Sequence, residues 1–415
     1  MVRVTVTRFV TPLVLSLASV SAYAQEPIKI GIIEPLTGPA ANVGTASQKS
    51  LAFFIDQANA AGGVLGRKFE LVSFDNKASP QETLVQFKAL TDQGIQYIYQ
   101  NTSSAVGAAL LDAVTKHNNR NPDKPVLQTN GGSVEPSLTN SMCHFYFFRF
   151  YPHSDMSLMA QMQHLKTNKN AKKVFLLNQD YSFGQAVSAT AKKLLKDFRP
   201  DIQIVGDELV PLLKVQDFSP QVAKIKASGA DTVITGNWGS DLSLFVRAAD
   251  AGGLKVTFYT QFAGAFGSPA AIGNAGNENI LEAALYQPSI AVEQGNKKLE
   301  QLYLDFKKVS GMDLWFLHHK TMMDGLITAM KKVNSTDPNK VAYALEGMEI
   351  PTEVGTVSIG AHDHQSVQPL FLSQFVKGAK YDVEKSGMGW KTILRIEGKD
   401  TVFPSTCNMK RPPRT

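Results

Sequence analysis

The sequence predicts a two-lobed α/β protein in which parallel sheets are flanked by helices. Three observations predict this fold class. Strand-like apolar runs alternate with helix-like segments, the alternation pauses after residue 128 and restarts at residue 174, and the 415-residue chain is too long for one small domain. Because consecutive parallel strands need a helical crossover, two separate series of strand–helix–strand units imply two sheets.

The first series of units lies in the N-terminal part of the chain. Residues 28–33 form an apolar, strand-like run. A helix follows, in which Leu51, Phe54, Ile55 and Ala58 recur at the spacing of one helix face. Further strands are expected at 69–74, 96–99 and 126–128, with helices beginning at Pro80 and after Ser104.

The second series opens at residues 174–177, a continuous apolar run that is typical of a buried strand. A helix is expected after Ser182. Further strands are expected at 202–205, 232–235 and 256–259, with helices near 222–226 and 242–249 between them. Helices rich in long side chains then cover 297–308 and 314–332, and strand-like segments follow at 356–359, 370–376 and 391–396.

The N-terminus has the pattern of a secretory signal peptide. Arg3 and Arg8 are the only charges before Glu26, and a short apolar core and an Ala-Tyr-Ala sequence ending at Ala24 follow them. The apolar core is shorter than the roughly 20 residues that span a membrane. We therefore expect residues 1–24 to be a signal peptide, and the mature protein to be exported.

The charge of the chain bears on its partners. The formal charge is +6 and falls to +4 when the two arginines of the signal peptide are lost. Lysines occur in scattered pairs, such as Lys172-Lys173 and Lys331-Lys332, and no basic stripe carries interleaved aromatic residues. We expect solvated helix faces here, and no nucleic-acid partner.

Several junctions between a strand and the next helix carry polar or aromatic residues. In parallel sheets, ligands bind beyond the carboxyl ends of the strands, where helix N-termini favour anions. Helix capping by itself explains serine and threonine at such places. It does not explain large aromatic residues, so these favour a ligand site. The junctions are Asn101-Thr102-Ser103, Asn130-Gly131-Gly132-Ser133, Asp180-Tyr181-Ser182-Phe183 and Asn237-Trp238-Gly239-Ser240.

An ordered set of motifs resembles one protein family. These are GIIEPLTGP at 31–39, NAAGGVLGR at 59–67, DNKASP at 75–80 and DYSFG at 180–184. Together they resemble the branched-chain amino-acid (Leu/Ile/Val-binding) type of periplasmic binding protein, the substrate-binding component of an ABC importer. The resemblance implies a type I periplasmic-binding fold, in which two Rossmann-like lobes are joined by a three-crossing hinge and close on the ligand.

The resemblance also implies how the chain is divided. The three crossings would fall near 148–152, 285–288 and 355–359. Lobe 1 would comprise 25–149 plus 287–356, lobe 2 would comprise 150–286 plus 357–400, and 401–415 would be a C-terminal tail.

The family's ligand contacts can be carried over to matching positions. The resemblance implies that Thr102, Ser103 and Ser133 contact the ligand carboxylate. It also implies an aromatic wall from the second lobe at Tyr181 or Phe183 and at Asn237-Trp238, to which Phe262 is added from the sequence that follows Tyr259.

One departure from the family bears on the ligand. Amino-acid binders of this family place an acidic residue just after the strand that here ends at Tyr259, to pair with the ligand ammonium. This chain has TQFAG at 260–264 and no acid before Glu278. A buried ammonium without a partner costs several kcal/mol. We therefore expect an aromatic or other organic acid ahead of a branched-chain amino acid, with an amide- or urea-type solute as an alternative.

The resemblance implies an inner-membrane ABC permease as partner, no cofactor, and a monomer. An enzyme is the main alternative from another class, but the sequence lacks a G-x-S-x-G elbow, a P-loop and a G-x-G-x-x-G after a strand. His362-Asp363-His364 is expected to be a solvated loop rather than a metal site, and His318-His319 offers no i, i+4 pair. A ligand-sensing receptor domain of the same fold would need a signalling or membrane segment after the lobes, and none is seen before Thr415.

The two cysteines predict a disulfide. Cys143 precedes an aromatic run, and Cys407 lies in a polar, proline-containing tail that would fray if left free. In an oxidising compartment, two lone thiols tend to pair where geometry allows. We therefore expect a Cys143–Cys407 bond that attaches the tail to the body; the alternative is two unrelated thiols.

Overall fold

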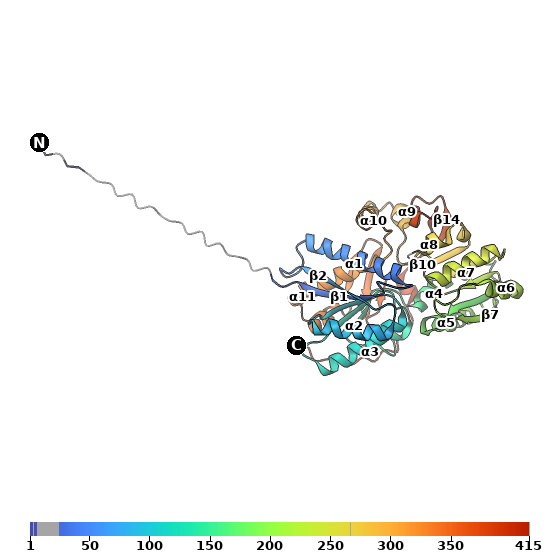
Figure 1. Cartoon of the computed structure of the whole chain (residues 1–415), viewed down its shortest axis with the longest axis horizontal. Helices are drawn as coiled ribbons and strands as arrows, with labels where there is room; N and C mark the ends of the chain where they lie inside the picture. Colours follow the sequence, from blue (N-terminus) through green and yellow to red (C-terminus); the bar gives the residue numbers. More distant parts are fainter. Residues whose placement is uncertain (3, 6–24, 266, 415) are drawn as a thin grey trace.

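The computed structural model describes residues 1–2, 4–5, 25–265 and 267–414. The signal peptide expected over residues 1–24 therefore falls outside the described residues, apart from four positions at its start. The described chain forms two α/β lobes that lie next to each other (Figure 1). Among these residues, no helix is long and apolar enough to cross a membrane.

The first lobe is built on a five-stranded parallel sheet with the order β2-β1-β3-β4-β5. Its first strand is buried along nearly its whole length, and the predicted apolar face of the first helix, with Leu51, Phe54 and Ile55, is buried. The elements are β1 (Ile28–Glu34), α1 (Ala41–Ala60), β2 (Phe69–Asp75), α2 (Pro80–Asp92), β3 (Tyr97–Gln100), α3 (Ser104–Arg120), β4 (Leu127–Asn130) and β5 (Phe147–Arg149).

The second lobe is built on a seven-stranded sheet with the order β15-β14-β10-β9-β8-β6-β7. It is parallel from β10 to β7, whereas β14 pairs antiparallel with both β10 and β15. The elements are α4 (Ser154–Leu165), β6 (Lys173–Gln179), α5 (Ser182–Phe198), β7 (Gln203–Val210), α6 (Ser219–Ser228), β8 (Thr232–Ile234), α7 (Ser240–Ala251), β9 (Thr257–Thr260), α8 (Ser268–Ile272), β10 (Ile280–Ala284), α9 (Pro288–Glu293), β14 (Leu370–Lys377) and β15 (Met388–Ile396).

Between β10 and β14 the chain returns to the first lobe. Helices α10 (Lys297–Ser310) and α11 (His318–Val333) both pack on α1, and α12 (Pro338–Leu345) packs on α11. A three-stranded antiparallel sheet follows, made of β11 (Glu349–Thr352), β12 (Gly355–Ile359) and β13 (Ser366–Val367).

The third crossing lies later than the sequence predicted. The segment 355–359 is not a crossing but strand β12, which pairs with β11 across a tight turn. The small sheet stays with the first lobe, where Gln365 forms a bridge with Arg149 of β5. The chain enters the seven-stranded sheet only at β14, so the passage falls at Gln368-Pro369. The other lobe boundaries stay a prediction.

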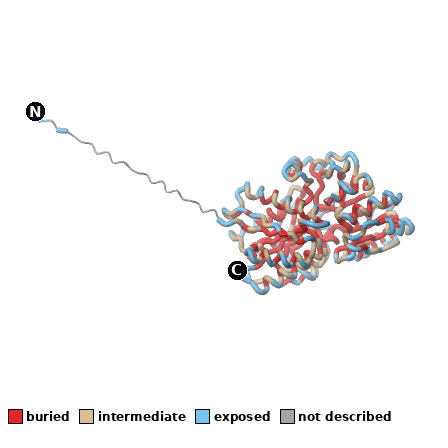
Figure 2. Tube along the Cα trace, viewed as in Figure 1, coloured by how far each residue is buried: buried red, intermediate tan, exposed pale blue. Residues whose placement is uncertain are grey.

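The core follows the two sheets. Buried residues run along both lobes (Figure 2), and one apolar cluster continues between the lobes through Phe150, Tyr151 and Leu285. The second lobe has a further cluster around Phe258, and the first has one around Ile98. The continuous cluster lies where the chain crosses between the lobes, so the hinge region is packed rather than open.

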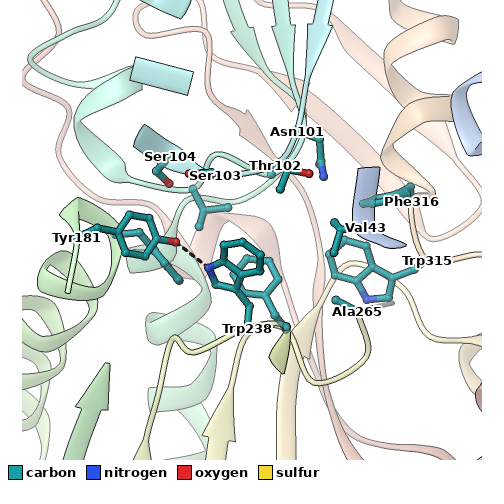
Figure 3. Close-up of a pocket in the computed structure, with 15 residues that line it drawn as sticks. Val43, Asn101, Thr102, Ser103, Ser104, Tyr181, Trp238, Ala265, Trp315 and Phe316 are labelled. Atoms are coloured by element: carbon teal, nitrogen blue, oxygen red, sulfur yellow. Dashed lines mark hydrogen bonds between the residues drawn. The ribbon is translucent and has the colours of Figure 1, made fainter. Parts of the chain in front are cut away.

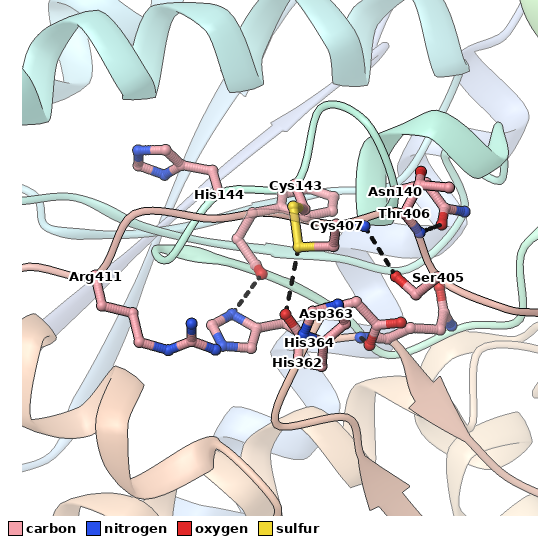
Figure 4. Close-up of a disulfide and its surroundings, with 12 residues drawn as sticks. Asn140, Cys143, His144, His362, Asp363, His364, Ser405, Thr406, Cys407 and Arg411 are labelled. Atoms are coloured by element: carbon pink, nitrogen blue, oxygen red, sulfur yellow. Dashed lines mark hydrogen bonds between the residues drawn. A yellow bond between two sulfur atoms is a disulfide. The ribbon is translucent and has the colours of Figure 1, made fainter.

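The C-terminal tail is attached to the first lobe. Cys143 and Cys407 form the predicted disulfide, with sulfur atoms 2.00 Å apart and Cα atoms 5.6 Å apart (Figure 4). The Thr406 N–H donates to Asn140 Oδ1 at 3.0 Å, and Asn339 Nδ2 donates to the Pro413 carbonyl at 3.1 Å. The tail is therefore held both covalently and by hydrogen bonds.

The expectation of a solvated loop at 362–364 is wrong for His364. Its ring is fully buried and stacks on Phe148 with centroids 3.9 Å apart. Its Nε2 lies 3.0 Å from Glu346 Oε1, a carboxylate that also accepts a hydrogen bond from Arg411 of the tail at 2.8 Å. A histidine between two strands packs inward here because the tail covers it and Glu346 pairs with it.

Candidate functional site

A cavity lies between the two lobes and takes its walls from both (Figure 3). It encloses about 550 Å³, its opening included. Lobe 1 supplies a polar wall at the β3–α3 junction, and lobe 2 supplies aromatic side chains. The lining residues are Val43, Asn101, Thr102, Ser103, Ser104, Gly132, Val134, Tyr181, Phe183, Trp238, Gly239, Phe262, Ala265, Trp315 and Phe316.

The polar wall is the N-terminus of α3. Ser103, the residue before this helix, has φ +73°, a conformation that non-glycine residues rarely adopt. The first turn of a helix leaves backbone N–H groups without intrahelical partners, and its end carries partial positive charge. Since Ser103 and Ser104 line the cavity, this helix end can bind an anion there.

A buried carboxylate lies behind the polar wall. Glu34, the last residue of β1, is fully buried. It accepts hydrogen bonds from the backbone N–H groups of Asn101 and Thr102, and from the Thr102 hydroxyl at 2.5 Å. Burial raises the pKa of Glu34 to about 7, and these hydrogen bonds lower it only in part. The proton of the Thr102 hydroxyl is thus directed away from the cavity.

The opposite wall is a series of aromatic rings. Trp238 Nε1 donates to the Tyr181 hydroxyl at 2.8 Å (Figure 3). Phe183 lies edge-on to Tyr181 and to Phe262, with centroids 5.8 Å apart in both pairs. Phe262 is also 6.3 Å from Trp315, which extends the series to the first lobe. Such a wall can pack against a flat, apolar ligand.

A second buried carboxylate supports the loop that carries Phe262. Glu282 of β10 accepts hydrogen bonds from Gln287 Nε2 at 2.6 Å and from the Gly264 N–H. Burial raises the pKa of Glu282 to about 8, and the two hydrogen bonds counteract this only in part. Glu282 does not line the cavity, and none of the described lining residues is charged.

The described residues contain no group of three histidine, cysteine or acidic side chains that could hold a metal ion. What the site offers is a helix N-terminus, hydroxyl groups and aromatic rings from two lobes. This arrangement suits binding of a small solute.

The sequence from residue 27 to residue 380 matches the family described as periplasmic binding protein. The chain belongs to this family. It is therefore a solute-binding protein of the leucine/branched-chain type and not an enzyme, and the family implies a periplasmic location.

Relatives of this binding protein cover most of its length. It is 33% identical to Leu/Ile/Val-binding protein homolog 4 of Brucella melitensis over 412 residues, 96% of each chain. It is similar to the closed conformation of a leucine-, isoleucine-, valine-, threonine- and alanine-binding protein from Brucella ovis, with a TM-score of 0.85, 31% identity, and coverage of 93% of this chain and 100% of that one. A solute-binding protein from Rhodopseudomonas palustris BisB5, in complex with 3,4-dihydroxy benzoic acid, shares the fold with a TM-score of 0.76, 19% identity, and coverage of 90% and 98%.

The structure brings most of the residues predicted for the binding site together around one cavity. Six of the eight line it, namely Thr102, Ser103, Tyr181, Phe183, Trp238 and Phe262.

Ser133 and Asn237 do not line the cavity. The Ser133 hydroxyl is buried and lies 2.8 Å from Gln100 Oε1 and 2.9 Å from the Ser103 carbonyl oxygen, either of which can accept its single proton. It therefore supports the wall from behind. The Asn237 side chain is buried, and its backbone N–H donates to Thr235 Oγ1 at 3.0 Å. Both point inward because the strand end places them on the core side of the junction.

The sequence analysis missed lining residues from the first lobe, chiefly Trp315, Phe316 and Val43. The predicted helix at 314–332 included the two aromatic residues, whereas α11 begins at His318 and leaves them in the preceding loop. Large aromatic residues directly before a helix were the available signal, the same signal that Tyr181 and Trp238 give in the second lobe.

Proposed function

We propose that this protein captures a small organic carboxylate, preferably an aromatic one, between its lobes and delivers it to an inner-membrane ABC permease. We propose further that residues 1–24 direct its export and that it acts as a monomer. The observation that carries the proposal is the composition of the cavity: a helix N-terminus faces aromatic rings, and none of the described lining residues is acidic.

The ligand carboxylate would bind at the N-terminus of α3. Ser103 and Ser104 offer hydroxyl and backbone donors there, and hydrogen bonds to a charged group contribute about 1.5–3 kcal/mol each. The ring of the ligand would pack against Trp238 and Phe262.

The fold neighbour from Rhodopseudomonas palustris supports this ligand class, because it holds 3,4-dihydroxy benzoic acid in the same fold. A branched-chain amino acid is the second candidate, favoured by the name of the Brucella melitensis relative. Its ammonium would need a carboxylate. Glu282, an acid behind the Phe262 loop, is fully buried and already accepts hydrogen bonds from Gln287 and the Gly264 N–H.

Calorimetric titration of the purified mature protein tests the proposal. Benzoate should bind, whereas benzamide, which matches its shape but lacks the charge, should bind at least about tenfold more weakly if the helix N-terminus recognises a carboxylate. Isovalerate is a carboxylate without a ring, so its affinity relative to that of benzoate shows what the aromatic ring contributes. Leucine tests the amino-acid alternative, and urea and acetamide test the amide alternative. Tight leucine binding with no response to benzoate would contradict the proposal.

A further inference from the structure

Glu34 lies directly behind the wall that would bind the ligand carboxylate. One of its oxygens, Oε1, accepts the N–H groups of Asn101 and Thr102, and the other, Oε2, accepts the Thr102 hydroxyl. Asn101 and Thr102 both line the cavity. A short stretch of backbone is thus all that separates Glu34 from the proposed position of the ligand's negative charge.

Among the described residues, no cation pairs with Glu34 to fix its charge. None of the ion pairs among the described residues includes Glu34. On β3, Tyr99 faces it, and the Tyr99 hydroxyl lies 3.2 Å from His318 Nε2 and 2.7 Å from His319 Nε2.

The other titratable groups nearby do not exchange protons near neutral pH. Burial lowers the pKa of His318 to about 3 and holds that of His319 well below its ordinary value, and burial raises the pKa of the Tyr99 hydroxyl. On β2, Asp75 is the register partner of Glu34; burial acts to raise its pKa, but hydrogen bonds from Thr37, Lys77 and Leu36 hold that pKa below its ordinary value. Around Glu34, only its own carboxyl is left to change charge in this range.

We propose that Glu34 is a positioning residue that takes up a proton when an anionic ligand binds, and that this proton turns the Thr102 hydroxyl toward the ligand. This inference rests on the proposed function. Two carboxylates on either side of one backbone loop repel each other in a site of low dielectric, so the bound ligand favours protonated Glu34.

The proton balance is simple. One proton from solvent binds to Glu34 Oε2, which then donates to Thr102 Oγ1 where it previously accepted. Thr102 keeps its own proton, which is now free to be donated into the cavity. Glu34 Oε1 continues to accept the N–H groups of Asn101 and Thr102. No bond other than these hydrogen bonds changes, and the complex gains a donor for the ligand carboxylate while losing a negative charge.

The pH dependence follows from this exchange. Burial raises the pKa of Glu34 in the empty site to about 7. Below this pH the proton is already present and benzoate affinity should be flat. Above it, the proton must be taken up on binding, so affinity should fall by up to about tenfold per pH unit. The variant Glu34→Gln carries an amide donor in place of the proton, and should bind with the low-pH affinity of the wild type at every pH.

Titration calorimetry with benzoate, in two buffers of different ionisation enthalpy, counts the protons. At pH 8 the wild type should take up close to one proton and at pH 5.5 almost none, whereas Glu34→Gln should take up none at pH 8. Thr102→Ser keeps the hydroxyl and should still take up close to one proton at pH 8. Thr102→Val lacks the donor and should lose affinity at pH 5.5, which provides a test should Glu34→Gln fail to fold.

The outcomes are distinct. Benzoate binding without proton uptake overturns the inference and leaves the proposed function intact. If proton uptake persists in Glu34→Gln, the proton binds to another group, such as Glu282, and the inference is also overturned. If leucine binds and benzoate does not, the proposed function fails and the inference fails with it.

Discussion

At the scale of single residues, two serines of the same wall should behave differently on substitution. Ser103 lines the cavity, whereas the Ser133 hydroxyl is buried and bonded to Gln100 and to the Ser103 carbonyl. Ser103→Ala should weaken benzoate binding by about 1.5–3 kcal/mol, as expected for a lost bond to a charged group, and change stability little. Ser133→Ala should lower the free energy of unfolding by about 0.5–1.5 kcal/mol, the net worth of one lost hydrogen bond, because Gln100 Oε1 still accepts from Asn130 Nδ2 and the Ser103 carbonyl still accepts from the Gly107 N–H.

Calorimetry and urea unfolding of both variants measure the two effects. Loss of stability in Ser103→Ala with unchanged affinity would show that this serine only supports the helix end.

These two serines also show how far a sequence can predict a site. The junctions themselves could be located, since strands, helices and polar breaks are visible in the pattern. Whether a side chain faces the cavity or the core depends on the backbone turn at the strand end, and Ser133 and Asn237 turned inward. The φ of +73° at Ser103 has no signal in the residue type, because glycine or asparagine would be expected there.

At the scale of elements, the pH dependence of stability should reflect the carboxyl that holds the loop between β9 and α8. The folded-state pKa of Glu282 is raised to about 8 from an ordinary value of 4.5. Between these values the folded protein binds a proton that the unfolded chain releases, so the free energy of unfolding falls as pH rises through this window.

Glu282→Gln should remove this contribution. Its unfolding free energy should fall less steeply between pH 5 and pH 8 than that of the wild type, by up to about 1.4 kcal/mol per pH unit. Buried histidines with lowered pKa values act in the opposite sense below about pH 6.5, but they are common to both proteins and cancel in the comparison. Urea unfolding at several pH values measures this free energy for both proteins. If it fell equally steeply with pH in the variant and in the wild type, the raised pKa of Glu282 would be contradicted.

The disulfide is the second feature to test at this scale. It joins residues 264 positions apart and holds the tail against the first lobe. Replacing both cysteines by serine should lower the free energy of unfolding by about 2–5 kcal/mol, since the closed loop restricts the unfolded chain. Urea unfolding of the double variant beside the oxidised wild type measures this, and the reduced wild type is the matched control. An unchanged midpoint would mean that the hydrogen bonds of the tail suffice.

Most elements could be predicted from periodicity. There are physical reasons why the remaining elements could not be predicted. Helix α4 has buried side chains on several of its faces, including Met156, Ser157 and Leu158, so it lacks an amphipathic period. Strand β10 contains alanines and Glu282 instead of an apolar run, although all of it is buried. Strand β11 begins with Glu349 and contains a proline, so only its partner β12 stood out.

At the scale of the whole molecule, the two lobes should move as bodies. The cavity takes its walls from both, and the chain passes between them three times. A ligand that contacts both walls favours the closed arrangement. Small-angle scattering should therefore show a smaller radius of gyration with saturating benzoate than without it. A radius that benzoate leaves unchanged would indicate that the lobes are rigid relative to each other.

The central claim is that an aromatic carboxylate binds between the α3 N-terminus and the aromatic wall. A crystal structure of the mature protein with 4-bromobenzoate tests it most directly, because the anomalous signal of bromine locates the ring independently of the protein density. The bromine should lie among Trp238, Phe262 and Trp315, with the carboxylate within hydrogen-bonding distance of Ser103 or Ser104. A bromine outside this cavity, or a carboxylate turned away from the helix N-terminus, would contradict the account.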